Sequence, residues 1–157
     1  MTFPDLGLTS AQAVRPAADG ADSRSLDPDH ASAALGATLM RVSLGIVYLA
    51  HGPLLKGMVF GLPGVSGYFT SLGLPGALAY VVFAMETLGG IMLVLGIRPG
   101  LAALALLPVL FGAILFDHGA NGWLFSMPGG GWEYPVFLIV ASVAVWLTRG
   151  GAYCLKP

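Results

Sequence analysis

From Ser32 onward the chain alternates between long apolar stretches and short segments rich in glycine, proline and charge. The apolar stretches cover residues 33–57, 75–97, 100–116 and 132–148. Each is close to the roughly 20 residues that a helix needs to cross about 30 Å of hydrocarbon, and none has the alternation of a membrane β-strand. Helices satisfy their own backbone polar groups in lipid, so the pattern predicts an all-α fold, an integral membrane four-helix bundle over residues 33–151.

The first connection, residues 58–74, is itself unusually apolar. Four helix-disfavouring residues interrupt it: Gly61, Pro63, Gly64 and Gly67. We expect a re-entrant segment, or one lying in the membrane interface, rather than another crossing. The connection at residues 117–131 leaves the bundle at the same end. Its Trp123 and Phe125 suit an interfacial aromatic belt, so the two segments together are predicted to cover that end.

Composition supports a membrane protein. Hydrophobic residues make up 56% of the chain and charged residues only 10%, which excludes an ordinary soluble domain. A net charge of -1 with seven Lys and Arg residues argues against nucleic acid as a partner. Residues 1–32 hold seven of the fifteen charged residues and show no hydrophobic period. They are predicted to be a disordered cytoplasmic tail, and residues 152–157 a short cytoplasmic C-terminal tail.

Basic residues set the expected orientation. With four crossings, one side collects Arg15, Arg24, Arg98, Arg149 and Lys156, whereas the other side has only Lys56. The positive-inside rule then places both termini in the cytoplasm of a multi-pass protein of a bacterial-type plasma (inner) membrane. The only cysteine, Cys154, would lie in a reducing compartment, so cysteine-pair redox chemistry is not expected.

Glu86 is the first candidate functional residue. It lies eleven residues into the second apolar stretch, about 16 Å deep, where a charge needs a partner or a function. Depth places it between Arg41 and His51 of the first stretch, and the sequence does not choose between these partners. Spacings of three and four residues put one set on a single helical face, namely Arg41, Gly45, Tyr48, Gly52 and Lys56.

A second polar group is expected at the other end of the bundle and comprises Lys56, Asp117, His118 and Glu133. One interpretation is interfacial snorkelling and helix capping. The other is a ligand pocket lined by His51, Lys56, Glu86, His118 and Glu133. His51, Asp117, His118 and Glu133 could supply metal ligands, but no two of them have a local spacing such as i,i+4, so no metal site is assigned. Bis-histidine haem ligation by His51 and His118 is a weaker alternative than ordinary hydrogen bonding.

Three strings resemble the DoxX family: RVSLGIVYLAHGPLLK, METLGGIMLVLGIRPG and NGWLFSMPGGGWEYP. The resemblance covers about residues 35–151, although the C-terminal RGGAYCLKP departs from the family pattern. It implies a small four-helix membrane protein, related to subunits of quinol oxidase or thiosulfate:quinone oxidoreductase systems. The matching positions are Arg41, Lys56, Glu86, Gly89, Gly90 and Glu133.

Two classes of function fit these observations. In the first, the chain is a membrane subunit of a quinone-linked oxidoreductase, with Glu86 as the proton relay. The quinone would be bound by Tyr48, His51, Lys56 and neighbouring polar residues. In the second, the chain is a non-catalytic scaffold in which Glu86 only fixes helix register. A small-molecule transporter fits less well, since four spans without internal repeats give little room for alternating access. The expected partners are the lipid bilayer, other membrane or periplasmic subunits, and a second copy of the chain.

Overall fold

The computed structural model describes residues 28–156, so residues 1–27 of the predicted tail lie outside it. Helix α1 (Pro28–Leu49) continues without a break into a π-helical segment, η2 (Ala50–Val59). Helix α1 thus includes residues 28–32, which the sequence analysis assigned to the tail. Pro28 suits a first helical position because its φ is preset, and Asp29 complements the N-terminal dipole. The wide helical turns of η2 surround Pro53, which lacks the amide proton of a regular helix.

The remaining elements are also helical. Helix α2 (Leu62–Ser71) is short and is followed by α3 (Leu78–Leu95) and α4 (Pro99–Ala113). Helix α4 extends into η3 (Ile114–His118) and η4 (Gly119–Asn121), and a loop leads to α5 (Glu133–Leu147). Each predicted apolar stretch therefore corresponds to one long helix, and the all-α bundle expected from the sequence is confirmed.

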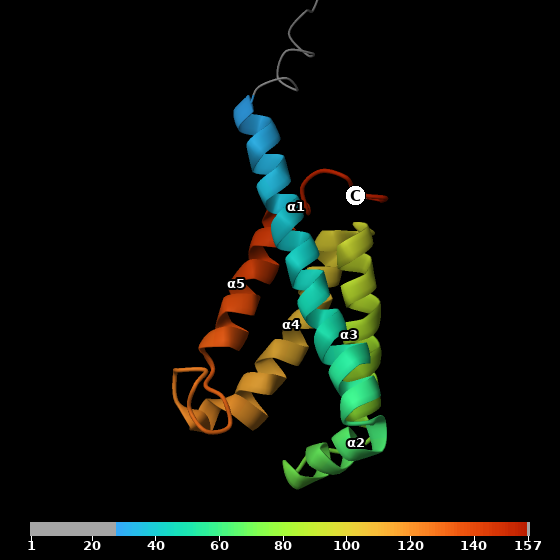
Figure 1. Ribbon diagram of the computed structural model, residues 1–157, viewed down its shortest axis with the longest axis vertical. Coiled ribbons are helices and arrows are strands. Elements are labelled where there is room, and N and C mark those ends of the chain that lie inside the picture. Colours follow the sequence, from blue (N-terminus) through green and yellow to red (C-terminus); the bar gives the residue numbers. More distant parts are fainter. Residues whose placement is uncertain (1–27, 157) are drawn as a thin grey trace, which may run out of the picture.

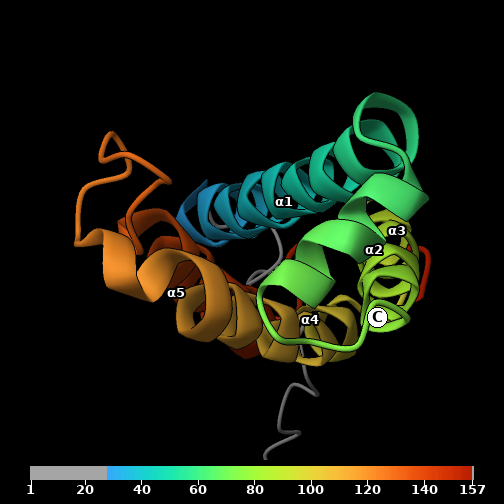
Figure 2. The ribbon, with the colours of Figure 1, turned by 90° about the horizontal axis from the view of Figure 1, so that it is seen from below.

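The four long helices form two pairs. Helix α1 packs along α3, and α4 packs along α5, while α3 with α4 and α1 with α5 join the pairs. Figure 1 shows the pairs meeting near the C-terminus and diverging toward the end where α2 lies. Seen from that end, α2 crosses beneath the bundle next to α3 (Figure 2). We call the two ends of the molecule the charged end and the α2 end.

The core of the bundle is apolar and draws on all four long helices. Its buried members are Leu44, Tyr48, Leu93, Ala102, Ala103, Leu106, Leu110, Leu138, Ala141 and Val145. Small residues bring the helices together. A Cβ atom on Gly45 of α1 would lie 2.9 Å from the carbonyl oxygen of Gly90 on α3, so the two backbones touch. Such close approach is typical of helix contacts in membranes.

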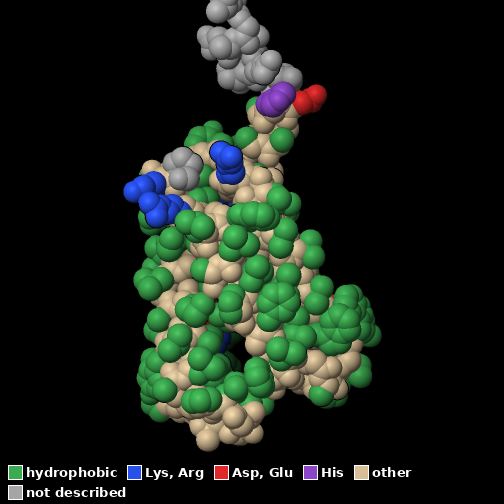
Figure 3. Space-filling view, turned by 180° about the vertical axis from the view of Figure 1, so that it is seen from behind, with side chains coloured by type: hydrophobic (Ala, Val, Ile, Leu, Met, Phe, Trp, Pro, Cys, Tyr) green, Lys and Arg blue, Asp and Glu red, His purple; other side chains and the backbone are tan. Residues whose placement is uncertain are grey.

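Arg41 holds the charged end together. Its guanidinium is buried and donates to carbonyl oxygens at the end of α3, Leu93 and Val94, at 2.7 and 3.1 Å. It also donates to three carbonyls after α5, those of Gly150, Ala152 and Tyr153. A cation thus caps two helix C-termini, where the backbone dipoles favour positive charge. In Figure 3 most of the visible Lys and Arg surface lies around this end.

Within residues 28–156, three helical segments are long and apolar enough to cross a membrane. They are Asp29–Val59, Leu78–Leu95 and Pro99–Asn121, and Glu133–Leu147 is a shorter apolar helix beside them. Hydrophobic side chains cover most of the surface between the two ends (Figure 3), as expected for a surface that meets lipid.

Candidate functional site

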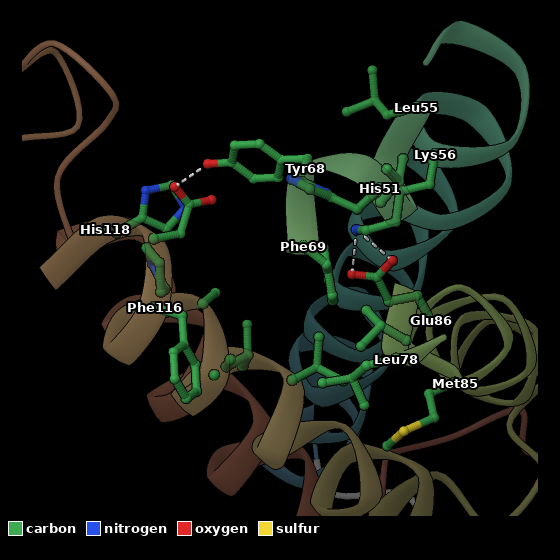
Figure 4. Close-up of a pocket in the computed structure, with 18 of the residues that line it drawn as sticks. His51, Leu55, Lys56, Tyr68, Phe69, Leu78, Met85, Glu86, Phe116 and His118 are labelled. Carbon is green, nitrogen blue, oxygen red and sulfur yellow. Dashed lines mark hydrogen bonds and ion pairs between the residues drawn. The ribbon is translucent and has the colours of Figure 1, made fainter. Parts of the chain in front are cut away.

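The diverging helix pairs leave a cavity of about 800 Å³ at the α2 end. Its wall is mostly aliphatic and aromatic and comes from α1, η2, α2, α3, α4, η3 and α5. Figure 4 shows the polar side chains projecting from two opposite sides of this space. A cavity of this size, apolar with a few polar groups, is typical of a site for a small organic ligand.

An ion pair between Lys56 and Glu86 lies on one wall of the cavity. Lys56 Nζ donates to Glu86 Oε1 at 2.8 Å and to Oε2 at 2.7 Å. The exposed fractions of the two side chains are 17% and 5%. Gly52 lets the helix that carries Lys56 pack closely against Glu86. A Cβ atom on Gly52 would lie only 3.1 Å from Glu86 Cβ. Glu86 therefore sits level with Gly52, and the long stem of Lys56, one turn further along, spans the remaining distance.

His51 projects into the cavity between Lys56 and Tyr68 (Figure 4). Its Nδ1 lies 2.8 Å from the carbonyl oxygen of Val47, one turn earlier in the same helix. The imidazole also faces the ring of Tyr134 from α5, with ring centroids 6.4 Å apart and planes inclined by 28°. His51 and Glu86 both line this part of the cavity.

Tyr48 forms a deeper part of the wall, one turn from Gly52. The residue is 2% exposed, and its hydroxyl forms no hydrogen bond to any described residue. Ser142 of α5 and Glu86 of α3 are among the polar groups near this hydroxyl. Because the hydroxyl itself is enclosed, Tyr48 contributes its ring to the cavity and its polar end to the contact between α1 and α5.

A hydrogen bond crosses the cavity from α2 to η3. Tyr68 Oη donates to Asp117 Oδ1 at 2.7 Å, and both residues line the space (Figure 4). This bond to a carboxylate raises the pKa of the Tyr68 hydroxyl to about 12. Helix α2 otherwise packs against α3 and η2, so the bond ties it to the opposite helix pair.

His118 and Glu133 organise the loop before α5. His118 Nδ1 lies 3.1 Å from the carbonyl oxygen of Gly130, and Asn121 Nδ2 donates to the same oxygen. Glu133 Oε1 accepts a hydrogen bond from the Phe125 amide at 2.8 Å. His118 also lines the cavity, whereas Glu133 does not.

The structure thus brings together some of the residues singled out from the sequence. Tyr48, His51, Lys56, Glu86 and His118 all line the cavity. Arg41 lies at the charged end among backbone carbonyls, and Glu133 is the first residue of α5, where its side chain holds the preceding loop. Of the partners considered for Glu86, neither Arg41 nor His51 forms its ion pair, which Lys56 provides.

Three further residues line the cavity that were not predicted from the sequence to do so: Tyr68, Asp117 and Tyr134. The signal for Tyr68 was its place in the apolar, helix-breaking segment predicted to cover this end. Within residues 28–156, no cluster of three or more His, Cys, Asp or Glu side chains is arranged to hold a metal ion.

Comparisons with known proteins agree with this architecture. The DoxX family model matches residues 36–119, more than half of the chain. The chain is 30% identical over 123 residues to a Bacillus subtilis (strain 168) protein named "Putative oxidoreductase CatD", covering 78% of this chain and 86% of that protein. No solved structure matches the chain. The family match and the apolar helices together show that the chain is a multi-pass membrane protein of the DoxX family.

Proposed function

We propose that this protein is the membrane subunit of a redox system and that its cavity binds the ring of a quinone-class ligand. Glu86 is the proton relay, and Lys56 and His51 contact the ring oxygens. The observation that carries the proposal is the Lys56–Glu86 ion pair, placed on the wall of an apolar cavity of about 800 Å³. The name of the Bacillus subtilis relative supports the redox class.

The placement of the ion pair favours a function over a purely structural role. Charges in a membrane bundle are costly, and those that persist commonly line a ligand or proton path. Lys56 has three N–H groups, and its two hydrogen bonds both go to Glu86, so a further N–H is available to a ligand oxygen. Glu86 remains within reach of the same ligand and can accept a proton from it.

The apolar remainder of the cavity suits the rest of such a ligand. Phe69, Leu78, Met85 and Phe116 stand around the polar groups (Figure 4). A flat ring gains from packing against aromatic and aliphatic side chains, and an isoprenoid tail needs an apolar channel. The divergence of the helix pairs at this end provides that channel.

Orientation and partners complete the proposal. Arg98 lies between α3 and α4, Arg149 follows α5, and Lys156 accepts a backbone hydrogen bond from Arg98, so all three lie at the charged end with Arg41. This end is therefore assigned to the cytoplasm of a bacterial-type plasma membrane. The cavity then opens toward the periplasmic leaflet. Electron transfer to or from a bound quinone involves other membrane or periplasmic subunits of the same system.

The test compares Glu86→Gln with Glu133→Gln, a matched change at a carboxylate outside the cavity. Each protein is placed in lipid nanodiscs and titrated with a short-tail benzoquinone, and the melting temperature is measured in parallel. Glu86→Gln removes the charge that orients Lys56 and is expected to weaken binding about tenfold or more while the protein stays folded. Glu133→Gln is expected to bind like the wild type.

Equal binding by the wild type and Glu86→Gln would contradict the proposal. Together with a raised melting temperature in Glu86→Gln, that result would favour the scaffold role, because buried ion pairs often fail to offset their desolvation cost.

A further inference from the structure

We infer that His51 makes the cavity selective for the hydroxyl-bearing, reduced form of its ring ligand. This inference rests on the proposed function and adds the chemical form that the site prefers. It follows from the tautomer that the structure imposes on His51.

The tautomer is fixed by the Val47 carbonyl. A carbonyl oxygen only accepts hydrogen bonds, so the 2.8 Å contact with His51 Nδ1 requires the proton to be on Nδ1. In the neutral imidazole, Nε2 then carries a lone pair and acts as an acceptor. No described residue forms a hydrogen bond to Nε2, and the ring that carries it projects into the cavity (Figure 4).

The contacts of His51 hold the ring in this orientation. The bond to Val47 ties one edge of the imidazole to its own helix, and Tyr134 of α5 faces the ring plane. The acceptor is thus presented by a side chain that is held on two sides. Pre-organisation of this kind is what makes a polar group discriminate between ligands.

The neighbouring groups strengthen the preference for a hydroxyl. Glu86 is an acceptor, and Lys56 is a donor, so the two groups beside His51 offer both roles. A phenolic hydroxyl can accept from Lys56 and donate to His51 or Glu86. A quinone carbonyl can only accept, so it leaves the Nε2 lone pair facing a second lone pair. When the quinone binds, His51 Nε2 is left without a hydrogen-bond donor. The quinone, which lacks the hydroxyl, therefore binds more weakly than the hydroquinone.

The experiment uses three ligands of nearly the same shape: a short-chain benzohydroquinone, its quinone and its dimethyl ether. Only the first can donate a hydrogen bond. Binding to the full chain in lipid nanodiscs is measured under anoxic conditions. The wild type is expected to bind the hydroquinone about tenfold more tightly than the dimethyl ether, and more tightly than the quinone.

Two variants separate the acceptor from the packing of the ring. His51→Phe keeps an aromatic ring beside Tyr134 but removes Nε2. It is expected to lose most of the preference for hydroquinone over dimethyl ether, with Glu86 as the remaining acceptor. His51→Gln restores an acceptor oxygen and is expected to recover part of the difference, so it remains informative if His51→Phe does not fold.

The outcomes distinguish this inference from the proposed function. If the wild type binds all three ligands equally, or if His51→Phe keeps the full preference, the role of His51 is overturned while a ring site remains. If none of the three ligands binds to folded wild-type protein, both the inference and the proposed function are wrong.

Discussion

The carbonyl oxygen of Gly90 on α3 lies 2.9 Å from the place that a Cβ atom would occupy on Gly45 of α1. A contact this short leaves no room for a methyl group unless the two backbones separate. The Cβ would also meet Val94 Cγ2 at 2.8 Å. The α1–α3 pair, which carries both members of the Lys56–Glu86 ion pair, therefore depends on a glycine at position 45.

Gly45→Ala is accordingly expected to lower stability by about 1 to 3 kcal/mol, the usual cost of overpacking. Gly112→Ala is the matched control, since a Cβ on Gly112 of α4 meets nothing within 4 Å. That change is expected to leave stability unchanged or raise it, because alanine is the better helix former. Thermal unfolding in detergent measures both. Equal melting temperatures for the two variants would show that the backbones are not in contact.

Arg41→Lys tests the cap at the charged end. A lysine keeps the positive charge but has only three N–H groups on a single nitrogen, and it cannot reproduce the five carbonyl contacts of the guanidinium fork. Carbonyls left unpaired in a buried site cost about 1 to 3 kcal/mol each, so a clear fall in melting temperature is expected. Arg149→Lys, at an exposed position, is the control and should melt like the wild type. A wild-type melting temperature in Arg41→Lys would contradict the cap.

Tyr68 gives a prediction in alkaline solution. Its bond to Asp117 raises its pKa from 10.0 to about 12, so the bond contributes to stability below pH 10 and is lost as the pH rises through about 12. The absorbance of tyrosinate, taken as the difference between wild type and Tyr68→Phe, should therefore change with a midpoint near 12.

Asp117→Asn removes the carboxylate and should return the midpoint of Tyr68 toward 10. A midpoint near 10 in the unaltered protein would show that the hydrogen bond across the cavity does not form in solution.

Orientation is tested by thiol labelling in intact cells. In a Cys154→Ser background, Gly64→Cys places a thiol on α2, where a Cβ meets nothing within 4 Å, and Leu155→Cys places one at the exposed C-terminal segment. A membrane-impermeant reagent applied from outside is expected to label Gly64→Cys and to reach Leu155→Cys only after lysis. The reverse pattern would place the charged end in the periplasm.

The fold could be anticipated because its determinants are local. The length and hydrophobicity of each stretch are properties of neighbouring residues, and the three- and four-residue spacing identified one face of α1. The structure buries Arg41, Gly45, Tyr48 and Gly52 on that face and half-buries Lys56. Among the helix bounds, α1 begins earlier than expected, since residues 28–32 continue the helix instead of belonging to the tail.

The pairings within the site could not be anticipated in the same way. Glu86 pairs with Lys56 because the long lysine side chain extends back past Gly52. The estimated depth of each Cα atom in the membrane does not include the length of the side chain, so it did not predict this pair. Tyr68 and Asp117 are 49 positions apart, and their contact depends on how α2 crosses the bundle. The partners of Arg41 are backbone carbonyls. Every residue has such a carbonyl, so the sequence does not indicate which ones Arg41 contacts.

The Arg41 cap has a mechanical consequence for the opposite end. Helix α4 and η3 together run from Pro99 to His118, about 30 Å, from the capped end to the mouth of the cavity. A rotation of about 5° at the cap would shift the far end of such a rod by about 2.5 Å, comparable to the small rigid-body movements of packed helices. Arg41 joins α1 to the end of α3 and to the segment after α5, where the two helix pairs meet. We therefore expect its carbonyl contacts to influence how far apart the pairs stand at the cavity.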